Sequence, residues 1–165
     1  MHENGEQEGT EDNSKVPTLV ESILELLMAG LSDKELYVRW SSAKGLGRIT
    51  NRLRKSYAAQ LVSLLCDRIS TVALLACDHY ALQGGCLALA ELARRGLLLP
   101  DRLDSVMPIV HKSLNYDEKL GHQTYGHIVR DAACYVSILV VLFCVEYIHL
   151  DIFSLPGLLV VCSCF

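Results

Sequence analysis

One segment of the chain has the glycine spacing of a phosphate-binding loop. Residues 44–48, Lys-Gly-Leu-Gly-Arg, contain the Gly-x-Gly pattern that lets backbone N–H groups approach a phosphate. A nucleotide site of this kind also needs a preceding strand and either a third glycine or a Lys-Ser/Thr pair. The segment has none of these features. We therefore expect Gly45 and Gly47 to allow close helix packing rather than to bind phosphate.

Cysteine and histidine are the other residue types that could carry chemistry. The chain has seven cysteines and six histidines, but no Cys-x-x-Cys pair. His122, His127 and Cys134 match no zinc-ligand spacing, and no motif places a cysteine nucleophile beside a base. We predict a reduced, cytoplasmic protein that is not an enzyme and has no catalytic residue, metal or cofactor.

Basic residues recur where two predicted helices end. The whole chain is acidic, with a net charge of −4 and a pI near 5.8, which gives no overall case for nucleic-acid binding. Stacked helices would join these basic ends into a positive edge for an acidic protein partner. Alternatively, each cation only complements its helix dipole, which contributes about 0.3–1 kcal/mol. The candidate partner-binding residues are Arg48, Arg52, Arg54, Arg94 and Arg95, with Lys55 beside the first three.

The predicted helices that would carry these residues recur along the sequence with a long period. Arg39, Gln83 and Arg130 each open a segment rich in small residues, and they stand 44 and 47 residues apart. An amphipathic segment with helical spacing precedes each of them. Such a period, with two helices per unit, is typical of HEAT and armadillo repeats. We predict an all-α helical-repeat solenoid of about three helix pairs. The pairs would cover residues 16–55, 56–99 and 100–136.

Local signals refine this prediction. Ser32-x-x-Glu35 has capping-box spacing, which predicts a helix that starts there, runs to about Leu53 and buries Trp40. Gly84-Gly85 lies inside another predicted helix, where each glycine costs about 1 kcal/mol relative to alanine. We expect a neighbouring helix to pass close to this pair. The stretch from 115 to 126 is expected to be a polar connection.

Two aspartates precede the repeat arginines along the chain. Asp33 precedes Arg39, and Asp117 precedes Arg130. HEAT repeats use aspartate and arginine at such positions to tie neighbouring repeats together. We predict this structural role for the four residues, in preference to partner binding.

Both ends of the chain differ in composition from the repeats. Residues 1–15 are acidic and lack periodicity, so we expect disorder and no signal peptide. Residues 137–165 are apolar, but their longest uninterrupted apolar run, Ile138–Val145, falls far short of the roughly 20 residues that a membrane-spanning helix needs. We expect this tail to continue the last helix to about Tyr147, and to be an alternative end of a longer coding sequence.

Four stretches carry a family resemblance: Val38–Arg48, Gly84–Pro100, Tyr116–Lys119 and Val129–Val136. Together they resemble the tubulin-folding cofactor D family, whose members are also called tubulin-specific chaperones D. The resemblance covers about residues 16–136, and the seventeen-residue block that ends at Pro100 is its most specific part. Members are large and rich in HEAT repeats, so the chain is similar to an internal part of one.

The resemblance implies a function that composition and spacing do not reveal. Members of the family bind β-tubulin, join assemblies with tubulin cofactors C and E and an ARF-like small GTPase, and contribute to GTP hydrolysis by tubulin. The expected role is therefore a non-enzymatic, tubulin-binding chaperone segment in the cytoplasm, associated with the cytoskeleton. Two alternatives remain open at this point: a general scaffold for another protein, and a truncated product without independent function.

Overall fold

The computed structural model describes residues 18–75, 78–98, 102–117, 119–120, 123–124 and 126–148. The expectations for residues 1–15, and for the tail beyond residue 148, lie outside this part of the chain. The helices are α1 (Thr18–Gly30), α2 (Leu36–Thr50), α3 (Lys55–Leu75), α4 (His79–Ala93), α5 (Leu103–Leu114) and α6 (Gly126–Ile148). A short antiparallel hairpin of β1 (Lys119–Leu120) and β2 (Gln123–Thr124) precedes α6.

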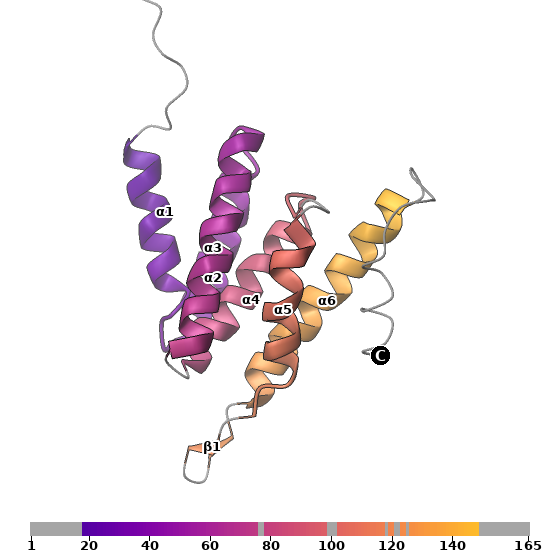
Figure 1. Cartoon of the computed structure of the whole chain (residues 1–165). Helices are drawn as coiled ribbons and strands as arrows, with labels where there is room; N and C mark the ends of the chain where they lie inside the picture. The colour runs from indigo at the N-terminus through magenta and orange to yellow at the C-terminus, as the bar shows by residue number, and fades with distance from the viewer. Residues whose placement is uncertain are drawn as a thin grey trace, which may run out of the picture.

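The helices form two layers (Figure 1). In one layer α4 packs between α2 and α6, and in the other α3 packs against α5. The layers are joined because α1 packs on α2, α3 on α4, and α5 on α6. This arrangement of helix pairs confirms the predicted all-α helical-repeat solenoid.

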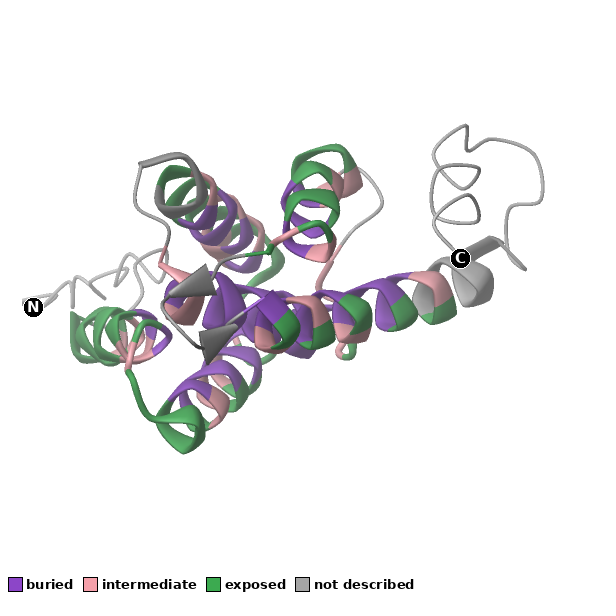
Figure 2. Cartoon of the chain, turned by 90° about the horizontal axis from the view of Figure 1, so that it is seen from below, coloured by how far each residue is buried: buried purple, intermediate pink, exposed green. Residues whose placement is uncertain are grey.

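Helix α4 is the centre of the core. Each of its residues from Ala81 to Ala93 is buried, and the helix is surrounded by α2, α3 and α6 (Figure 2). Buried apolar side chains from those three helices and α5 complete one continuous core around it. The small side chains of α4 let neighbours approach on every side, which a helix of larger residues would prevent.

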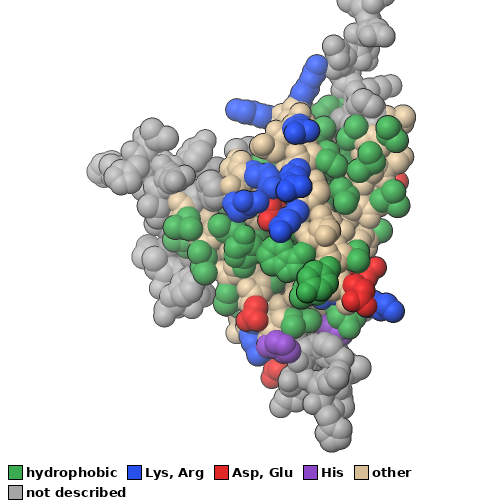
Figure 3. Space-filling view, turned by 180° about the vertical axis from the view of Figure 1, so that it is seen from behind, with side chains coloured by type: hydrophobic (Ala, Val, Ile, Leu, Met, Phe, Trp, Pro, Cys, Tyr) green, Lys and Arg blue, Asp and Glu red, His purple; other side chains and the backbone are tan. Residues whose placement is uncertain are grey.

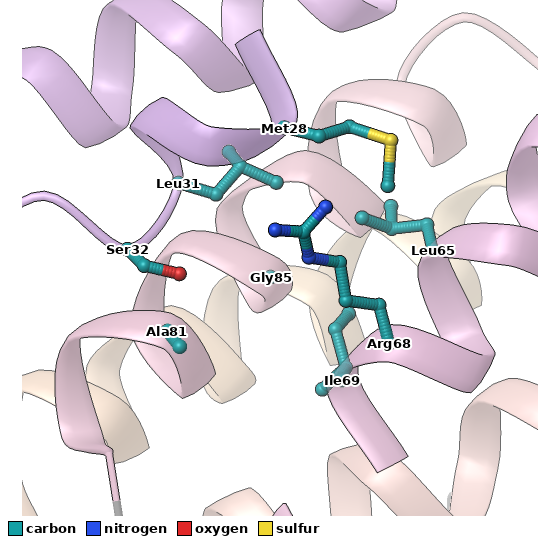
Figure 4. A pocket seen from close by; sticks show the side chains of 8 residues that line it. All are labelled: Met28, Leu31, Ser32, Leu65, Arg68, Ile69, Ala81 and Gly85. Atoms are coloured by element: carbon teal, nitrogen blue, oxygen red, sulfur yellow. The ribbon is translucent and has the colours of Figure 1, made fainter. Parts of the chain in front are cut away.

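The glycine pair in α4 lies where neighbouring segments come closest. A Cβ on Gly84 would stand 1.9 Å from the carbonyl oxygen of Leu31, and one on Gly85 would stand 2.5 Å from Cγ1 of Ile69. The expectation of a close neighbouring helix is therefore confirmed at Gly85, which faces α3, whereas Gly84 faces the turn after α1. Around Gly85, Leu31 and Ile69 line a cavity of about 20 Å³ (Figure 4). That volume holds about one water molecule, so the cavity is a packing gap rather than a ligand site.

The predicted capping box at the start of α2 is wrong. The helix begins at Leu36, so Glu35 is its N-cap residue and makes no side-chain capping bond. Instead, the backbone N–H of Glu35 donates to Oδ1 of Asp33 at 2.8 Å, which closes a local turn before the helix. An aspartate competes for nearby N–H groups in this way wherever the chain has not yet become helical.

The expected end of α2 and the expected burial of Trp40 are corrected by the structure. Helix α2 ends at Thr50, short of Leu53, and Trp40 is only half-buried. The polar connection before α6 contains the β1–β2 hairpin, which extends away from the helices (Figure 1). Within the described residues, the structure has no helix with the length and apolar character needed to span a bilayer.

Candidate functional site

The predicted basic residues gather at one end of the α2–α4 layer. Arg39 of α2 contacts Gln83 of α4, and Gly47 of α2 lies against Glu91 of α4, so the two helices run in the same direction. Their C-terminal ends therefore share one edge of the molecule. We call the residues there, Arg48, Arg52, Arg54, Arg94 and Arg95, the basic edge (Figure 3).

A tight turn holds the α4 part of the basic edge. Helix α4 ends at Ala93, and Gly96 adopts a φ of +66°, a left-handed conformation that glycine adopts without steric cost. The backbone N–H of Leu97 then donates to the carbonyl of Leu92 at 3.0 Å. This closure fixes the backbone that carries Arg94 and Arg95.

A buried carboxylate orients these two arginines. The Glu91 side chain is almost fully buried, and its Oε2 accepts hydrogen bonds from Arg94 Nη2 at 2.8 Å and from Arg95 Nη1. Burial alone would raise the pKa of Glu91, but the two guanidinium groups outweigh it and hold that pKa below the usual value of 4.5. The same hydrogen bond raises the pKa of Arg94. Two cations share one anion here, which leaves one positive charge uncompensated.

The members of the basic edge differ in what they offer a partner. Arg95 is largely covered, and its Nη1 lies 2.8 Å from the place that a Cβ on Gly47 would occupy. It therefore joins the ends of α2 and α4. Arg48, Arg52 and Arg54 are exposed and form no ion pair within the part of the chain that the structure describes. The positive charge available to a partner is mainly theirs and that of Arg94.

An aromatic pair continues this surface across α4. The rings of Trp40 on α2 and Tyr135 on α6 lie 6.0 Å apart between centroids, and Lys44 Nζ lies 5.4 Å from the Trp40 ring centroid. Both aromatic residues are half-buried. They can meet because the helix between them, α4, carries mostly small side chains. Trp40 was expected to be buried, and the sequence has no local signal for its contact with Tyr135.

Arg39 connects the first two repeats. Its Nε and Nη2 donate to Oε1 of Gln83 at 2.9 and 2.6 Å, and its Nη1 donates to the backbone carbonyls of Asp33 and Lys34. The guanidinium also stacks on Tyr80, 4.7 Å from the ring centroid. Burial lowers the pKa of Arg39. Asp33 thus contributes its carbonyl to this network, while its carboxylate is used in the turn before α2.

Arg130 makes a more local set of contacts. Its Nη1 donates to the carbonyl of Tyr116 at 2.8 Å and lies 3.8 Å from Oδ1 of Asp117. These contacts tie α6 to the segment that follows α5, within one helix pair. The two Asp–Arg combinations named from the sequence therefore differ: the contact across repeats is made by Arg39 with Gln83, and Asp117 with Arg130 acts inside its own pair.

Two of the described cysteines lie in the core and are poorly reactive. Cys66 and Cys86 are buried, and burial raises the pKa of each thiol to about 11, so neither is a ready nucleophile. Among the side chains that the structure places, no three His, Cys, Asp or Glu residues come together as a metal site. A fixed cationic surface beside an aromatic pair can instead attract and hold an acidic protein.

Comparison with known proteins identifies a matching family and two similar proteins. Residues 1–164 match the family described as tubulin-specific chaperone D-like, ARM repeats. The tubulin-specific chaperone D of Dictyostelium discoideum is 49% identical over 107 residues, which cover 64% of this chain and 7% of that protein. The tubulin-folding cofactor D of Schizosaccharomyces pombe is 29% identical over 135 residues, 76% of this chain and 12% of that protein. No solved structure matches the chain.

Proposed function

Because the chain belongs to the tubulin-specific chaperone D-like family of ARM-repeat proteins, we propose that it supplies a tubulin-binding surface in tubulin folding. The names of its relatives support a role with tubulin. The chain spans about a tenth of the length of those relatives, so we assign it one contact surface within a larger activity. We propose β-tubulin as the bound subunit, in the cytoplasm.

The basic edge is the observation that carries this proposal. Tubulin is acidic, and a cluster of exposed arginines on an otherwise acidic protein would steer it toward one face. The buried Glu91 pre-orients Arg94, so little side-chain entropy is lost on binding. Trp40 and Tyr135 would add apolar contact beside the charges.

The proposed role is binding rather than catalysis. Any contribution to GTP hydrolysis would act by holding tubulin, because the chemistry would take place at tubulin's own nucleotide. Cofactors C and E and an ARF-like GTPase are proposed as partners of the longer protein. We assign none of the described residues to contacts with them.

Co-sedimentation of the full chain with purified αβ-tubulin at low salt tests the proposal. Arg48→Glu with Arg52→Glu should weaken binding about tenfold or more, and added salt should weaken wild-type binding in the same direction. Lys34→Glu is the matched control, because it reverses an exposed charge at the opposite end of α2. Equal losses in the control and the double variant, or wild-type binding that salt does not change, would exclude the basic edge. A failure of the wild-type chain to bind would place the tubulin contact elsewhere in the longer proteins.

A further inference from the structure

The turn between α1 and α2 carries a serine whose hydroxyl is available. Ser32 lies in the connection of residues 31–35 and is exposed. The capping-box contact that its spacing predicted does not form, because the backbone N–H of Glu35 donates to Asp33 instead. The Ser32 N–H donates to the carbonyl of Ala29 at 3.1 Å, which holds the backbone of the turn. Within the described residues, the Ser32 hydroxyl has no hydrogen-bond partner.

An arginine of the next helix pair faces this turn. Arg68 lies on α3, and it lines the same small cavity beside Gly85 as Ser32 does (Figure 4). In that view, the Ser32 hydroxyl points toward the side on which the Arg68 guanidinium lies. Arg68 is exposed and makes no ion pair or hydrogen bond within the part of the chain that the structure describes. Its guanidinium is therefore free to bind an anion carried by Ser32.

The floor beneath these two residues is apolar. Four buried side chains from α1, from the turn after it and from α3 line the cavity: Met28, Leu31, Leu65 and Ile69. Because this floor excludes water, a contact between opposite charges at the rim is screened by solvent mainly from outside. The first helix pair forms one side of the junction and the second pair forms the other. An ion pair at this place would join the two pairs.

The residues after Ser32 favour modification by one class of enzyme. Asp33 and Glu35 follow the serine at positions +1 and +3, and Glu35 is exposed. A kinase with a basic peptide-binding surface selects such acidic positions by charge complementarity. We propose that Ser32 is a phosphorylation site for an acidophilic Ser/Thr kinase, and that Arg68 binds the phosphate.

The reaction changes the charge at the junction. The γ-phosphoryl group of ATP is transferred to Oγ of Ser32, the hydroxyl proton passes to the catalytic base of the kinase, and ADP leaves. The product carries about −1.5 to −2 charge at pH 7 and three acceptor oxygens, to which a guanidinium can donate two parallel hydrogen bonds. Ser32 precedes α2, whereas the basic edge lies at the other end of that helix. The phosphate therefore strengthens the stacking of the two pairs without neutralising the basic edge.

Treatment of the full chain with ATP and purified casein kinase 2, a kinase that prefers acidic residues after its target, tests the acceptor. Peptide mapping in mass spectra should find phosphate on Ser32 of the folded chain, and Ser32→Ala should remove that signal. Ser22 also has a glutamate at position +3, but it should stay unmodified because it lies inside α1 and its hydroxyl donates to the carbonyl of Thr18 at 3.1 Å. A folded chain without phosphate on Ser32 overturns the proposal.

Arg68→Gln tests the phosphate contact. Phosphorylation should raise the Tm of the wild-type chain by about 2–4 °C, and that of the variant by less than half as much. The second pKa of the phosphate, measured by phosphorus NMR, should be lower in the wild-type chain, because a neighbouring cation favours the dianion. Lys55→Gln is the matched control, since it removes an exposed charge from the other end of α3. Equal phosphate pKa values in the wild-type and Arg68→Gln chains, or a Tm that falls on phosphorylation, overturn the role of Arg68.

Discussion

Arg39 and Arg130 occupy equivalent places in their repeats but make different contacts. Each donates to backbone carbonyls of the segment before its helix, Arg39 to Asp33 and Lys34, and Arg130 to Tyr116. Within the described residues, Arg39 also contacts the next repeat, through Gln83, and it is 3% exposed. The Arg130 side chain is 42% exposed.

The difference shows that the repeat arginine can have two separate structural roles. One is to bind the turn before its own helix, and the other is to contact the next repeat. Both residues fasten the start of a helix to the turn before it. The contact between repeats requires an acceptor on the second helix of the next pair, which Gln83 of α4 provides for Arg39. We call the contact region of α2 and α4 the inner junction, and the region around Arg130 the outer junction.

Substitution of one glycine in each junction should give the largest difference in stability between the two junctions. In Gly84→Ala, the new Cβ would meet the Leu31 carbonyl, which is backbone and cannot move aside, so we expect a loss of about 3 kcal/mol. In Gly126→Ala, the new Cβ would meet Nη1 of Arg130 at 2.6 Å and the backbone carbonyl oxygen of Tyr116 at 2.8 Å, a milder overlap with backbone than the 1.9 Å at Gly84. We expect a smaller loss there, about 1 kcal/mol. Urea denaturation of both variants measures the difference, and equal losses would contradict it.

Replacement of each repeat arginine should give the next largest difference in stability between the two junctions. Arg39→Met leaves buried Gln83 and two carbonyls without their donor, and should lower the free energy of unfolding by about 2–3 kcal/mol. Arg130→Met removes partly exposed contacts and should lower it by less than about 1 kcal/mol. Denaturant titration of both proteins provides the measurement.

A double-mutant cycle sharpens this result. Arg39→Met combined with Gln83→Leu should cost less than the sum of the two single changes, because each single variant already breaks the shared hydrogen bonds. Additive losses would mean that Arg39 stabilises the fold mainly through its own turn, as Arg130 does.

The stability that Glu91 contributes, at the C-terminal end of the inner junction, should depend on pH. The folded-state pKa of Glu91 is lowered, so its contribution is complete above the unfolded value near 4.5 and is lost as the pH falls through the lowered value. Glu91→Gln should reduce stability at neutral pH by about 1–2 kcal/mol, because it loses charge-assisted bonds. As the pH falls from about 5 to about 3, the variant should also lose less stability than the wild-type chain, because it has no carboxylate at this position to protonate. Thermal melts at several pH values test both effects, and parallel pH curves would contradict the assignment.

Thiol labelling provides the mildest comparison. Cys86, on α4, donates to Ser113 Oγ of α5 at 3.5 Å, and its pKa is raised to about 11 by burial. Cys134 lies exposed on α6. Under native conditions near pH 8, the peptide that contains Cys134 should be labelled first in mass spectra, and Cys86 only after unfolding. Similar labelling rates at the two sites would mean that the core around α4 opens readily.

The repeat architecture could be predicted from the sequence because it depends on periodicity. The 44-residue spacing of Arg39 and Gln83 proved to be a physical contact, and the Gly84-Gly85 pair signalled a close neighbour. The turn before α2 could not be predicted, because Asp33 and Ser32 compete for the same N–H groups and only the local backbone decides between them.

The surface was less predictable than the core. The position of Arg48 and Arg94 at helix ends implied a shared basic edge, since consecutive second helices of a solenoid run parallel. The role of Glu91 depends on the two arginines that follow it at the end of α4. The contact of Trp40 with Tyr135 depends on the small side chains of α4, which lies between α2 and α6. That information is distributed over three helices, and no short motif contains it.

The burial of α4 has a consequence for how the chain unfolds. Helices α2 and α6, of the first and third pairs, both pack on α4 of the second pair, so α4 loses its cover on both sides only when all three pairs separate. Amide hydrogens of α4 should therefore exchange with solvent only when the whole molecule opens, whereas those of α1 exchange through local fraying. A solenoid of many repeats can unfold in steps along its length. This stretch instead behaves as one cooperative unit, with the slowest-exchanging amides on the helix that has the smallest side chains.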